Sequence, residues 1–88
     1  IRQISQVLMQ DESMKLNIIG HTDADGTEEA NLKLSKARAE AVKQALIDVY
    51  NISGSRLTTD GKGESEPVGD NATSGGKAQN RRVEFVKQ

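Results

Sequence analysis

The stretch that decides the fold runs from residue 15 to residue 50 and reads KLNIIGHTDADGTEEANLKLSKARAEAVKQALIDVY. Its first five residues alternate briefly and are rich in branched side chains. Such a pattern predicts a β-strand, with Leu16 and Ile18 facing the interior. Gly20 closes this strand, and a polar loop follows over residues 21–26.

A long helix is expected after this loop. Thr27 has a hydroxyl that can cap a helix N-terminus, and two glutamates follow it in the first turn, where the helix dipole favours negative charge. Apolar residues then recur at helical intervals to about Tyr50. We expect the buried stripe of this helix to consist of Leu34, Ala37, Ala41, Val42, Ala45, Leu46 and Val49.

Shorter elements flank this segment on both sides. Residues 1–11 carry apolar side chains at helical spacing and predict an amphipathic helix. Residues 56–60 predict a short polar strand, and residues 82–86 alternate as a last strand. Between them, residues 61–76 are rich in glycine and predict a loop with at most one short helical turn. The expected fold class is α/β (α+β), a two-layer sandwich with helices on one face of a sheet.

The composition of the 88 residues limits the possible functions. Twelve Lys and Arg against 13 Asp and Glu give a net charge of −1, so no basic excess is present to drive binding to nucleic acid or to a membrane surface. Only Tyr50 and Phe85 are aromatic, which leaves little for base stacking. The lack of Cys excludes disulfides and zinc–thiolate sites. No apolar run approaches the ~20 residues that cross a bilayer.

The start of the chain shows one irregularity. The helix over residues 1–11 has no strand ahead of it, although such a helix is the natural crossover of a βαβ unit. The chain also opens at Ile1 rather than at Met. We therefore expect one domain over residues 1–88 that is truncated at its N-terminus. Its first strand, and any membrane attachment, would be encoded upstream of Ile1.

The loop GHTDADG at residues 20–26 is the first candidate site. Its Asp-x-Asp-Gly pattern occurs in calcium loops, but an EF-hand frame would require Asp where His21 stands and a bidentate Glu where Leu32 stands. No metal or cofactor is therefore expected, and a strand-to-helix turn is the simpler interpretation. No Ser or Cys lies in a motif that His21 could activate, so the case for catalysis is poor.

Asn31 and Arg38 form the second candidate. About two helical turns separate them, so both side chains project from one face of the long helix. A surface ion pair is the commoner role of a lone helix arginine. A helix N-terminus nevertheless attracts carboxylates, and Arg38 offers a bidentate fork for one. Asp23 could then take an ammonium, so that the two residues together would suit a zwitterionic amino-acid ligand.

Asn80, Arg81 and Arg82 precede the last strand and form the third candidate. The basic pair could contact an anion, or it could be edge-strand charge that prevents aggregation.

Taken together, these residues resemble the OmpA-like C-terminal domain, the peptidoglycan-binding module of outer-membrane proteins, Pal-type lipoproteins and flagellar stator proteins. The resemblance extends from Leu16 to Val86, in the same order and spacing. The residues that carry it are Gly20-His21-Thr22-Asp23, Gly26, Asn31, Leu34-Ser35, Arg38-Ala39, Val42, Leu46, Arg56-Leu57, Gly61, Gly63, Pro67, Asn71 and Asn80-Arg81-Arg82-Val83-Glu84-Phe85.

The resemblance implies a βαβαββ two-layer sandwich with a mixed sheet, whose first strand would lie ahead of Ile1. It also implies a site that grips the diaminopimelate residue of the peptidoglycan stem peptide. The ligand-binding residues carried over are Thr22, Asp23, Asn31 and Arg38, together with one arginine of the pair before the last strand. Strand alternation allows only one of Arg81 and Arg82 to face the ligand, and Arg81 is the expected one. Many members have Arg where this chain has Lys77, a change that keeps the charge but loses the bidentate fork.

The expected function is therefore non-covalent binding of peptidoglycan, which anchors an outer-membrane protein or lipoprotein to the cell wall on the periplasmic side of the bacterial outer membrane. Peptidoglycan is the expected partner, and no enzymatic activity is expected. One alternative is a wall-associated subunit-interaction module of a motor or secretion complex. Another is a wall hydrolase, which the lack of a nucleophile–base pair around His21 argues against. The oligomeric state is left open.

Overall fold

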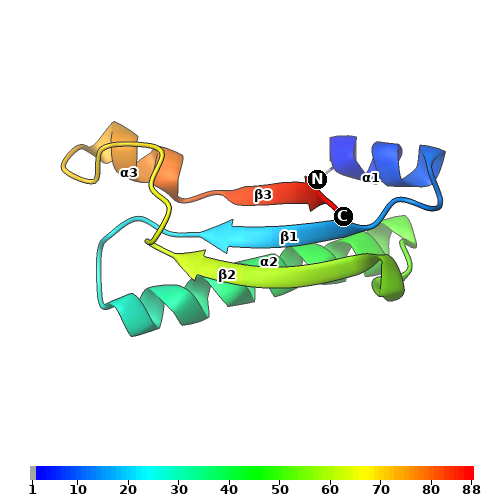
Figure 1. The fold of residues 1–88 in the computed structure, drawn as a ribbon, viewed down its shortest axis with the longest axis horizontal. Coiled ribbons are helices and arrows are strands. Elements are labelled where there is room, and N and C mark those ends of the chain that lie inside the picture. The colour runs from blue at the N-terminus through cyan, green and yellow to red at the C-terminus, as the bar shows by residue number, and fades with distance from the viewer. Residues whose placement is uncertain (1) are drawn as a thin grey trace.

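The computed structural model describes residues 2–88 of the chain (Figure 1). Its elements, in chain order, are α1 (Arg2–Gln10), β1 (Leu16–His21), α2 (Glu28–Tyr50), the short 3-10 helix η1 (Gly54–Arg56), β2 (Leu57–Gly63), α3 (Ser74–Asn80) and β3 (Val83–Lys87). The amphipathic helix, the strand and the long helix expected in the first half of the chain are confirmed, and so are the two later strands.

The three strands form one mixed sheet in the order β2-β1-β3. The central strand β1 is parallel to β2, with Leu16 opposite Leu57, and antiparallel to β3, with Ile18 opposite Phe85. The expected mixed α/β fold is confirmed. The further strand that we expect ahead of Ile1 lies outside the described residues.

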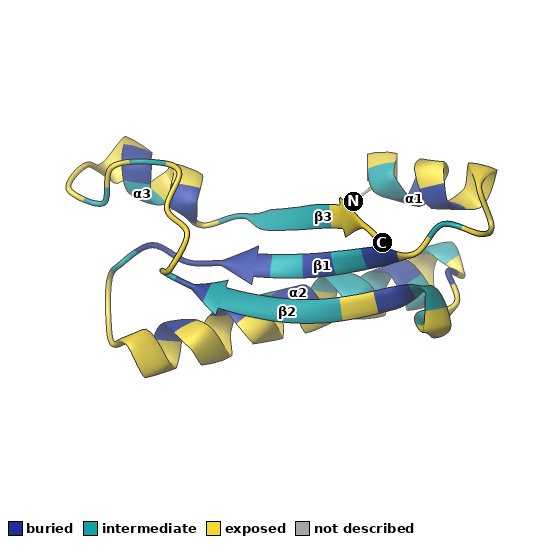
Figure 2. Cartoon of the chain, in the orientation of Figure 1, coloured by how far each residue is buried: buried dark blue, intermediate teal, exposed yellow. Residues whose placement is uncertain are grey.

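The core lies on one face of the sheet, between the strands and helices α1 and α2 (Figure 2). Leu16 and Ile18 face this interior as expected, since they are 2% and 0% exposed. Burial of each such side chain stabilises the fold by roughly 1.5–3 kcal/mol. The buried apolar residues are Leu8, Leu16, Ile18, Ala39, Leu46, Ile52 and Leu57.

Helix α2 has well-defined caps at both ends. Thr27 is its N-cap as expected, because Thr27 Oγ1 accepts a hydrogen bond from the Ala30 amide at 3.1 Å. At the other end, Asn51 adopts the left-handed φ of 56°, and its amide donates to the Leu46 carbonyl. These caps satisfy backbone groups that have no partner inside a helix.

The face of α2 that packs on the sheet differs from the one that we expected. Leu34 and Val49 are 44% and 69% exposed, and Ala37 and Ala41 are exposed as well. Of the predicted stripe, Leu46 is buried, and Val42 is half-buried against the core. The buried residues of α2 are Asn31, Ser35, Ala39 and Leu46.

A close approach between α2 and the strands explains this difference. A Cβ atom on Gly20 would lie 2.0 Å from the Ser35 carbonyl oxygen, and one on Gly61 would lie 2.7 Å from Ser35 Oγ. Gly20 and Gly61 are paired across β1 and β2. The helix backbone lies almost against the strand backbones here, so only small side chains fit into the contact. For this reason, the apolar periodicity of α2 does not indicate which face of the helix packs on the sheet.

Strands β1 and β2 both continue past the residues that we expected. His21, predicted in the loop, belongs to β1, and β2 ends at Gly63 rather than at Asp60. The register shifts at this point, because Gly20 is opposite Gly61 whereas His21 is opposite Gly63. Gly63 has a φ of 55°, which a glycine adopts without strain. The extra residue on β2 is typical of a β-bulge.

The sequence predicted a loop over residues 61–76 with at most one short helical turn. The structure instead has helix α3, which begins at Ser74 within that range and continues to Asn80. Thr73 is the N-cap of α3, and its Oγ1 accepts a hydrogen bond from the Gly76 amide at 2.9 Å. Two glycines in the first turn give this segment a low helix propensity, so the sequence does not indicate a helix. Packing compensates, since a Cβ on Gly76 would lie 2.0 Å from the Asp70 carbonyl oxygen.

Candidate functional site

The candidate residues lie at one end of the sheet, where β1 and β2 end and α2 begins (Figure 1). The loop from Thr22 to Thr27 crosses this end, and α3 lies at the same end. The Thr22 amide donates to the Gly63 carbonyl at 2.9 Å, and the Asn31 amide donates to the Thr27 carbonyl at 3.0 Å. The loop is therefore tied to the end of β2 and to the start of α2.

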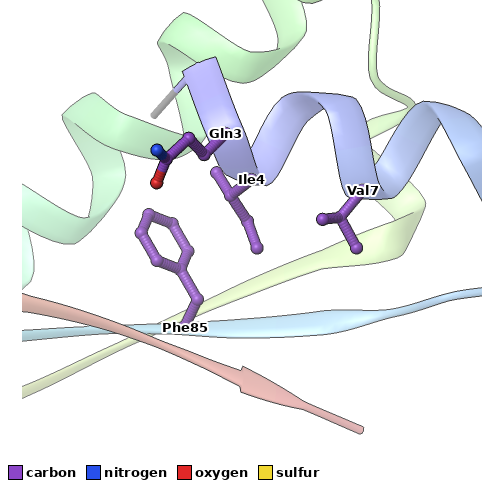
Figure 3. Close-up of a pocket in the computed structure, with 4 residues that line it drawn as sticks. All are labelled: Gln3, Ile4, Val7 and Phe85. Atoms are coloured by element: carbon purple, nitrogen blue, oxygen red, sulfur yellow. The ribbon is translucent and has the colours of Figure 1, made fainter.

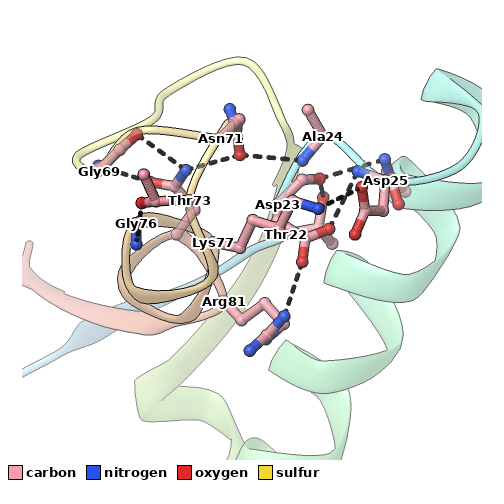
Figure 4. A network of polar contacts seen from close by, with 12 residues as sticks. Thr22, Asp23, Ala24, Asp25, Gly69, Asn71, Thr73, Gly76, Lys77 and Arg81 are labelled. Carbon is pink, nitrogen blue, oxygen red and sulfur yellow. Dashed lines mark hydrogen bonds and ion pairs between the residues drawn. The ribbon is translucent and has the colours of Figure 1, made fainter.

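The carboxylate of Asp23 is held by two neighbours (Figure 4). Asp23 Oδ1 accepts the Asp25 amide at 3.0 Å, and Asp23 Oδ2 accepts Arg81 Nη1 at 2.8 Å. The backbone hydrogen bond from Asp25, together with the Arg81 guanidinium, holds the pKa of the Asp23 carboxyl below its ordinary value of 3.8. Asp23 is therefore a fixed anion at neutral pH.

Thr22 and Asn31 hold the backbone of Asp23 rather than its carboxylate. Thr22 Oγ1 donates to the Asp23 carbonyl oxygen at 2.9 Å, and Asn31 Nδ2 donates to the same oxygen at 3.3 Å. Both side chains are buried. Buried polar groups of this kind cost about 1–3 kcal/mol when they lose a partner. Thr22 and Asn31 therefore fix the loop that carries Asp23.

Arg38 reaches the same end of the sheet from α2. Its Nη1 lies 3.4 Å from the His21 carbonyl oxygen, and the side chain is half-buried. Within residues 2–88 this guanidinium forms no ion pair. A guanidinium with a single long contact to a carbonyl has N–H groups left to bind a carboxylate at two points.

The two neighbouring arginines before β3 have different partners. Arg81 contacts Asp23, as described above. Arg82 instead donates from Nε to Glu84 Oε1 at 2.8 Å and from Nη2 to the Glu66 carbonyl at 2.9 Å. Only Arg81 of this pair is therefore joined to the loop that carries Asp23.

Sequence reasoning assigned no role to Asn71 and named Asn80 only beside the two arginines, although both belong to the motif series. Asn71 Oδ1 accepts the Ala24 amide at 3.1 Å (Figure 4). The same oxygen accepts Asn80 Nδ2 at 2.8 Å. Asn80 is fully buried, and its Oδ1 accepts the amides of Val68 and Gly69. Asparagine side chains in glycine-rich loops often bind main-chain groups and so hold the loop in one conformation. The asparagines in this glycine-rich segment are therefore the sequence signal that indicates this role.

Lys77 lies at the edge of this network. Lys77 Nζ is 3.1 Å from Asp25 Oδ1. The Asp25 carboxylate is largely exposed, so this ion pair contributes little stability. The ion pair joins α3 to the loop that carries Asp23.

His21 is fully buried, in contrast to the turn residue that we expected. Strand alternation places its side chain on the face of the sheet opposite Ile18 and the core. Its Nε2 lies 3.4 Å from Glu84 Oε1. Burial, and then the charge of Arg82, holds the pKa of His21 below its ordinary value of 6.5.

An apolar hollow of about 270 Å³ lies elsewhere, between α1 and β3. Its lining residues are Gln3, Ile4, Val7 and Phe85 (Figure 3). None of the candidate ligand-binding residues contributes to it. Within the described chain, no group of three or more His, Asp or Glu side chains is arranged to hold a metal ion. Among residues 2–88, none of the helices combines the length and apolar character that would cross a bilayer.

The fold places the chain in a class of small α/β domains with solved structures. It is similar to the peptidoglycan-associated lipoprotein from Burkholderia pseudomallei, with a TM-score of 0.90, 34% identity, and coverage of 99% of this chain and 73% of that one. It is also similar to the cell wall anchor of the T6SS from Pseudomonas aeruginosa, with a TM-score of 0.80, 35% identity, and coverage of 96% of this chain and 60% of that one.

The chain belongs to the OmpA family, whose sequence profile matches residues 1–81. It is 45% identical over 84 residues to outer membrane porin F of Pseudomonas aeruginosa, a match that covers 96% of this chain. The chain spans about a quarter of that protein's length (24%). The expected family is therefore confirmed. The expected location, on the periplasmic side of the outer membrane, agrees with these relatives.

Proposed function

We propose that residues 1–88 act as one domain that binds peptidoglycan non-covalently through the diaminopimelate of the stem peptide. The observation that carries this proposal is the presence, at one end of the sheet, of a fixed anion, Asp23, and of a guanidinium without an ion-pair partner among the described residues, Arg38. The free end of a diaminopimelate residue carries an ammonium and a carboxylate on one carbon atom. The two charges of the site match these two groups.

Arg38 takes the carboxylate in this arrangement. Its Nη1 makes one long contact with a backbone carbonyl, so its other N–H groups remain available for a two-point interaction. The backbone amides of the loop and of the start of α2 add partial positive charge at the same end. A lysine would supply the charge at this position but not the fork.

Asp23 takes the ammonium, and Arg81 keeps the Asp23 side chain in place. Asp23 Oδ2 already accepts Arg81 Nη1, but a carboxylate has about four lone-pair sites, so a further donor can bind. Arg81 is partly exposed and has other N–H groups for ligand oxygen atoms. Thr22 and Asn31 act through the Asp23 backbone.

The proposed role is that of an anchor for an outer-membrane protein or lipoprotein, without catalysis. Two charge contacts at an open site give modest affinity for one stem peptide. Firm attachment comes from many copies of the domain that engage one polymer at the same time. Binding of this kind requires no nucleophile, and neither ring nitrogen of His21 has a hydrogen-bond partner within the described residues that would activate it.

A pull-down with insoluble wall sacculi tests both parts of the proposal. The chain should sediment with the sacculi, and the supernatant should contain no more soluble muropeptide than a sample with boiled protein. Lys33→Ala, which removes an exposed cation from the same helix as Arg38, is the matched control and should bind as the wild type does. Release of muropeptides above the control would contradict the non-catalytic role, and failure to sediment would contradict the binding.

A wall-associated module of a secretion complex is the second candidate, favoured by the similarity to the T6SS cell wall anchor. Both candidates use the same wall site, so the binding experiment does not separate them. The sequence of the full-length protein separates them: a single transmembrane helix indicates a motor or secretion component, and a lipid-attachment sequence indicates a lipoprotein.

A further inference from the structure

His21 is a buried titratable group that the proposed function leaves unused. Its side chain is 0% exposed, and neither Nδ1 nor Nε2 forms a hydrogen bond with the described residues. It is also the only histidine of the chain. Because burial of a charge without its own partner costs far more than burial of a neutral ring, this imidazole is uncharged at neutral pH.

The carboxylate nearest to the ring, that of Glu84, is shared with Arg82. Glu84 Oε1 lies 3.4 Å from Nε2, but Arg82 already binds that oxygen through Nε and Nη2, each at 2.8 Å. The other charges that act on the ring are Glu66, in the loop after β2, and Lys62, on β2. The Arg38 guanidinium is a further cation nearby, because its Nη1 lies 3.4 Å from the His21 carbonyl oxygen.

His21 is connected to both charges of the proposed site. Its amide donates to the Arg82 carbonyl at 2.8 Å, and its carbonyl oxygen accepts Arg38 Nη1 at 3.4 Å. The residue before Arg82 is Arg81, which holds Asp23 at 2.8 Å. A movement of His21 or Arg82 therefore reaches Arg38 directly and Asp23 through one neighbouring residue.

We propose that the uncharged imidazole of His21 is a positioning residue for this site, and that uptake of a proton by His21 weakens the binding of peptidoglycan. This inference rests on the proposed function. A protonated ring attracts Glu84 Oε1, which lies 3.4 Å from Nε2, and competes for that oxygen with Arg82. Arg82 also donates to the Glu66 carbonyl at 2.9 Å, so a weaker contact between Arg82 and Glu84 loosens the segment that carries Arg81.

The expected change of ligand affinity with pH follows from the fraction of molecules in which the His21 ring is neutral. If only the form with a neutral ring binds, the apparent dissociation constant rises about tenfold for each pH unit below the pKa of His21. The Asp23 carboxyl stays ionised over this range, because its pKa lies below its ordinary value of 3.8. Model carboxyl groups, like those of the ligand, have pKa values of about 4.

Two measurements on the wild-type protein test the proposal. An NMR titration of the single histidine ring gives the pKa of His21 without assignment ambiguity. Calorimetric titration with a diaminopimelate-containing peptide, from about pH 7.5 to about pH 5, gives the affinity. We expect the pKa to lie below 6.5 and the affinity to fall with a midpoint at that pKa. An affinity that does not change over this range would overturn the proposal.

Variants separate the positioning role from a merely structural one. His21→Asn cannot take up a proton, so its affinity should be independent of pH, whatever its value at pH ~7.5. Glu84→Gln removes the carboxylate that favours the protonated ring, so the midpoint should move to lower pH. Glu12→Gln, an exposed carboxylate next to the end of α1, should keep the wild-type profile. A wild-type profile in His21→Asn would assign the pH dependence to another group and overturn the proposal.

Failure of the proposed function gives a different result. In that case the wild-type protein does not bind the peptide even at pH ~7.5. The coupling can still be read from the backbone amide resonances of Asp23 and Arg81 during the histidine titration. Resonances that move with the His21 pKa support the positioning role, and resonances that stay constant contradict it.

Discussion

Asn71 and Ala24 are separated by 47 residues in the chain, and Asn71 Oδ1 accepts a hydrogen bond from the Ala24 amide at 3.1 Å. Asn80 donates to the same oxygen at 2.8 Å. The loop that carries Asp23 is thus fixed by a second loop, the one that leads into α3. The position of a charged group in the proposed site therefore depends on an amide side chain that need not touch the ligand.

Replacement of Asn71 by Ala should weaken ligand binding as well as the fold. The change leaves the Ala24 amide and Asn80 Nδ2 without their shared acceptor, which should lower the free energy of unfolding by about 1–3 kcal/mol. Affinity for a diaminopimelate-containing peptide should fall about three- to tenfold, because the loop of Asp23 is less well held. Asn17→Ala, which removes a hydrogen bond with Thr58 on the sheet, is the control. Equal losses of affinity in both variants would contradict a specific role of Asn71.

Arg38→Ala should abolish measurable binding of the same peptide and leave the unfolding transition cooperative. The truncation leaves the ligand carboxylate without its partner, which costs more than the lost bond alone. Arg38→Lys should bind more weakly than the wild type but better than Arg38→Ala, because it keeps the charge and loses the fork. Calorimetric titration of both variants beside Lys33→Ala measures this order. Wild-type affinity in Arg38→Ala would remove this residue from the site.

Asp23→Asn should remove ligand binding and change the stability of the fold in acid. The folded-state pKa of Asp23 lies below 3.8, so the stability that its ionised form contributes is present above pH 3.8 and is lost as the pH falls through the folded-state value. The free energy of unfolding should therefore fall more steeply for the wild type than for Asp23→Asn between about pH 4 and about pH 2. Denaturant titrations at several pH values measure the two slopes. Parallel curves would show that Asp23 is not held as described.

Gly20→Ala should be strongly destabilising, whereas Gly75→Ala should not. A Cβ at position 20 would lie 2.0 Å from the Ser35 carbonyl oxygen, which forces the helix away from the sheet and should cost about 3 kcal/mol or more. A Cβ at position 75 meets nothing within 4 Å, and alanine is the better helix former, so stability should rise by about 0.5–1 kcal/mol. Thermal unfolding of the two variants compares these effects. A small loss in Gly20→Ala would show that α2 can move away from β1 at little cost.

The elements near Thr27 were predictable from sequence because local rules determine them. A capping hydroxyl, two glutamates and a branched strand ahead of Gly20 each act within a few residues of the element they define. The same holds for the gathering of Asp23, Asn31 and Arg38 at one end of the fold, which follows from the strand–loop–helix order. The use of these residues in ligand binding stays a prediction.

The features that sequence reasoning missed depend on contacts between distant segments. The buried face of α2 is set by Gly20 and Gly61, which admit Ser35 where a leucine would not fit. Helix α3 forms despite its two glycines because Asn80 binds the preceding loop. No local sequence pattern in either segment indicates these contacts. Apolar periodicity therefore predicted the wrong buried face of α2, and helix propensity did not predict α3.

The long axis of the molecule has a mechanical consequence. The described residues extend 41 Å in one direction and 22 Å in the other two, and the strands run along the long direction (Figure 1). The proposed site lies at one end, whereas α1 and the C-terminus lie at the other. If the wall holds the site, a pull on the chain at Arg2, the end where the sequence predicts any membrane attachment, passes through α1 into β1. Because Asp23 lies just beyond the end of β1, this strand carries the load along its own backbone, and the lifetime of the tethered domain is then set by its rate of forced unfolding.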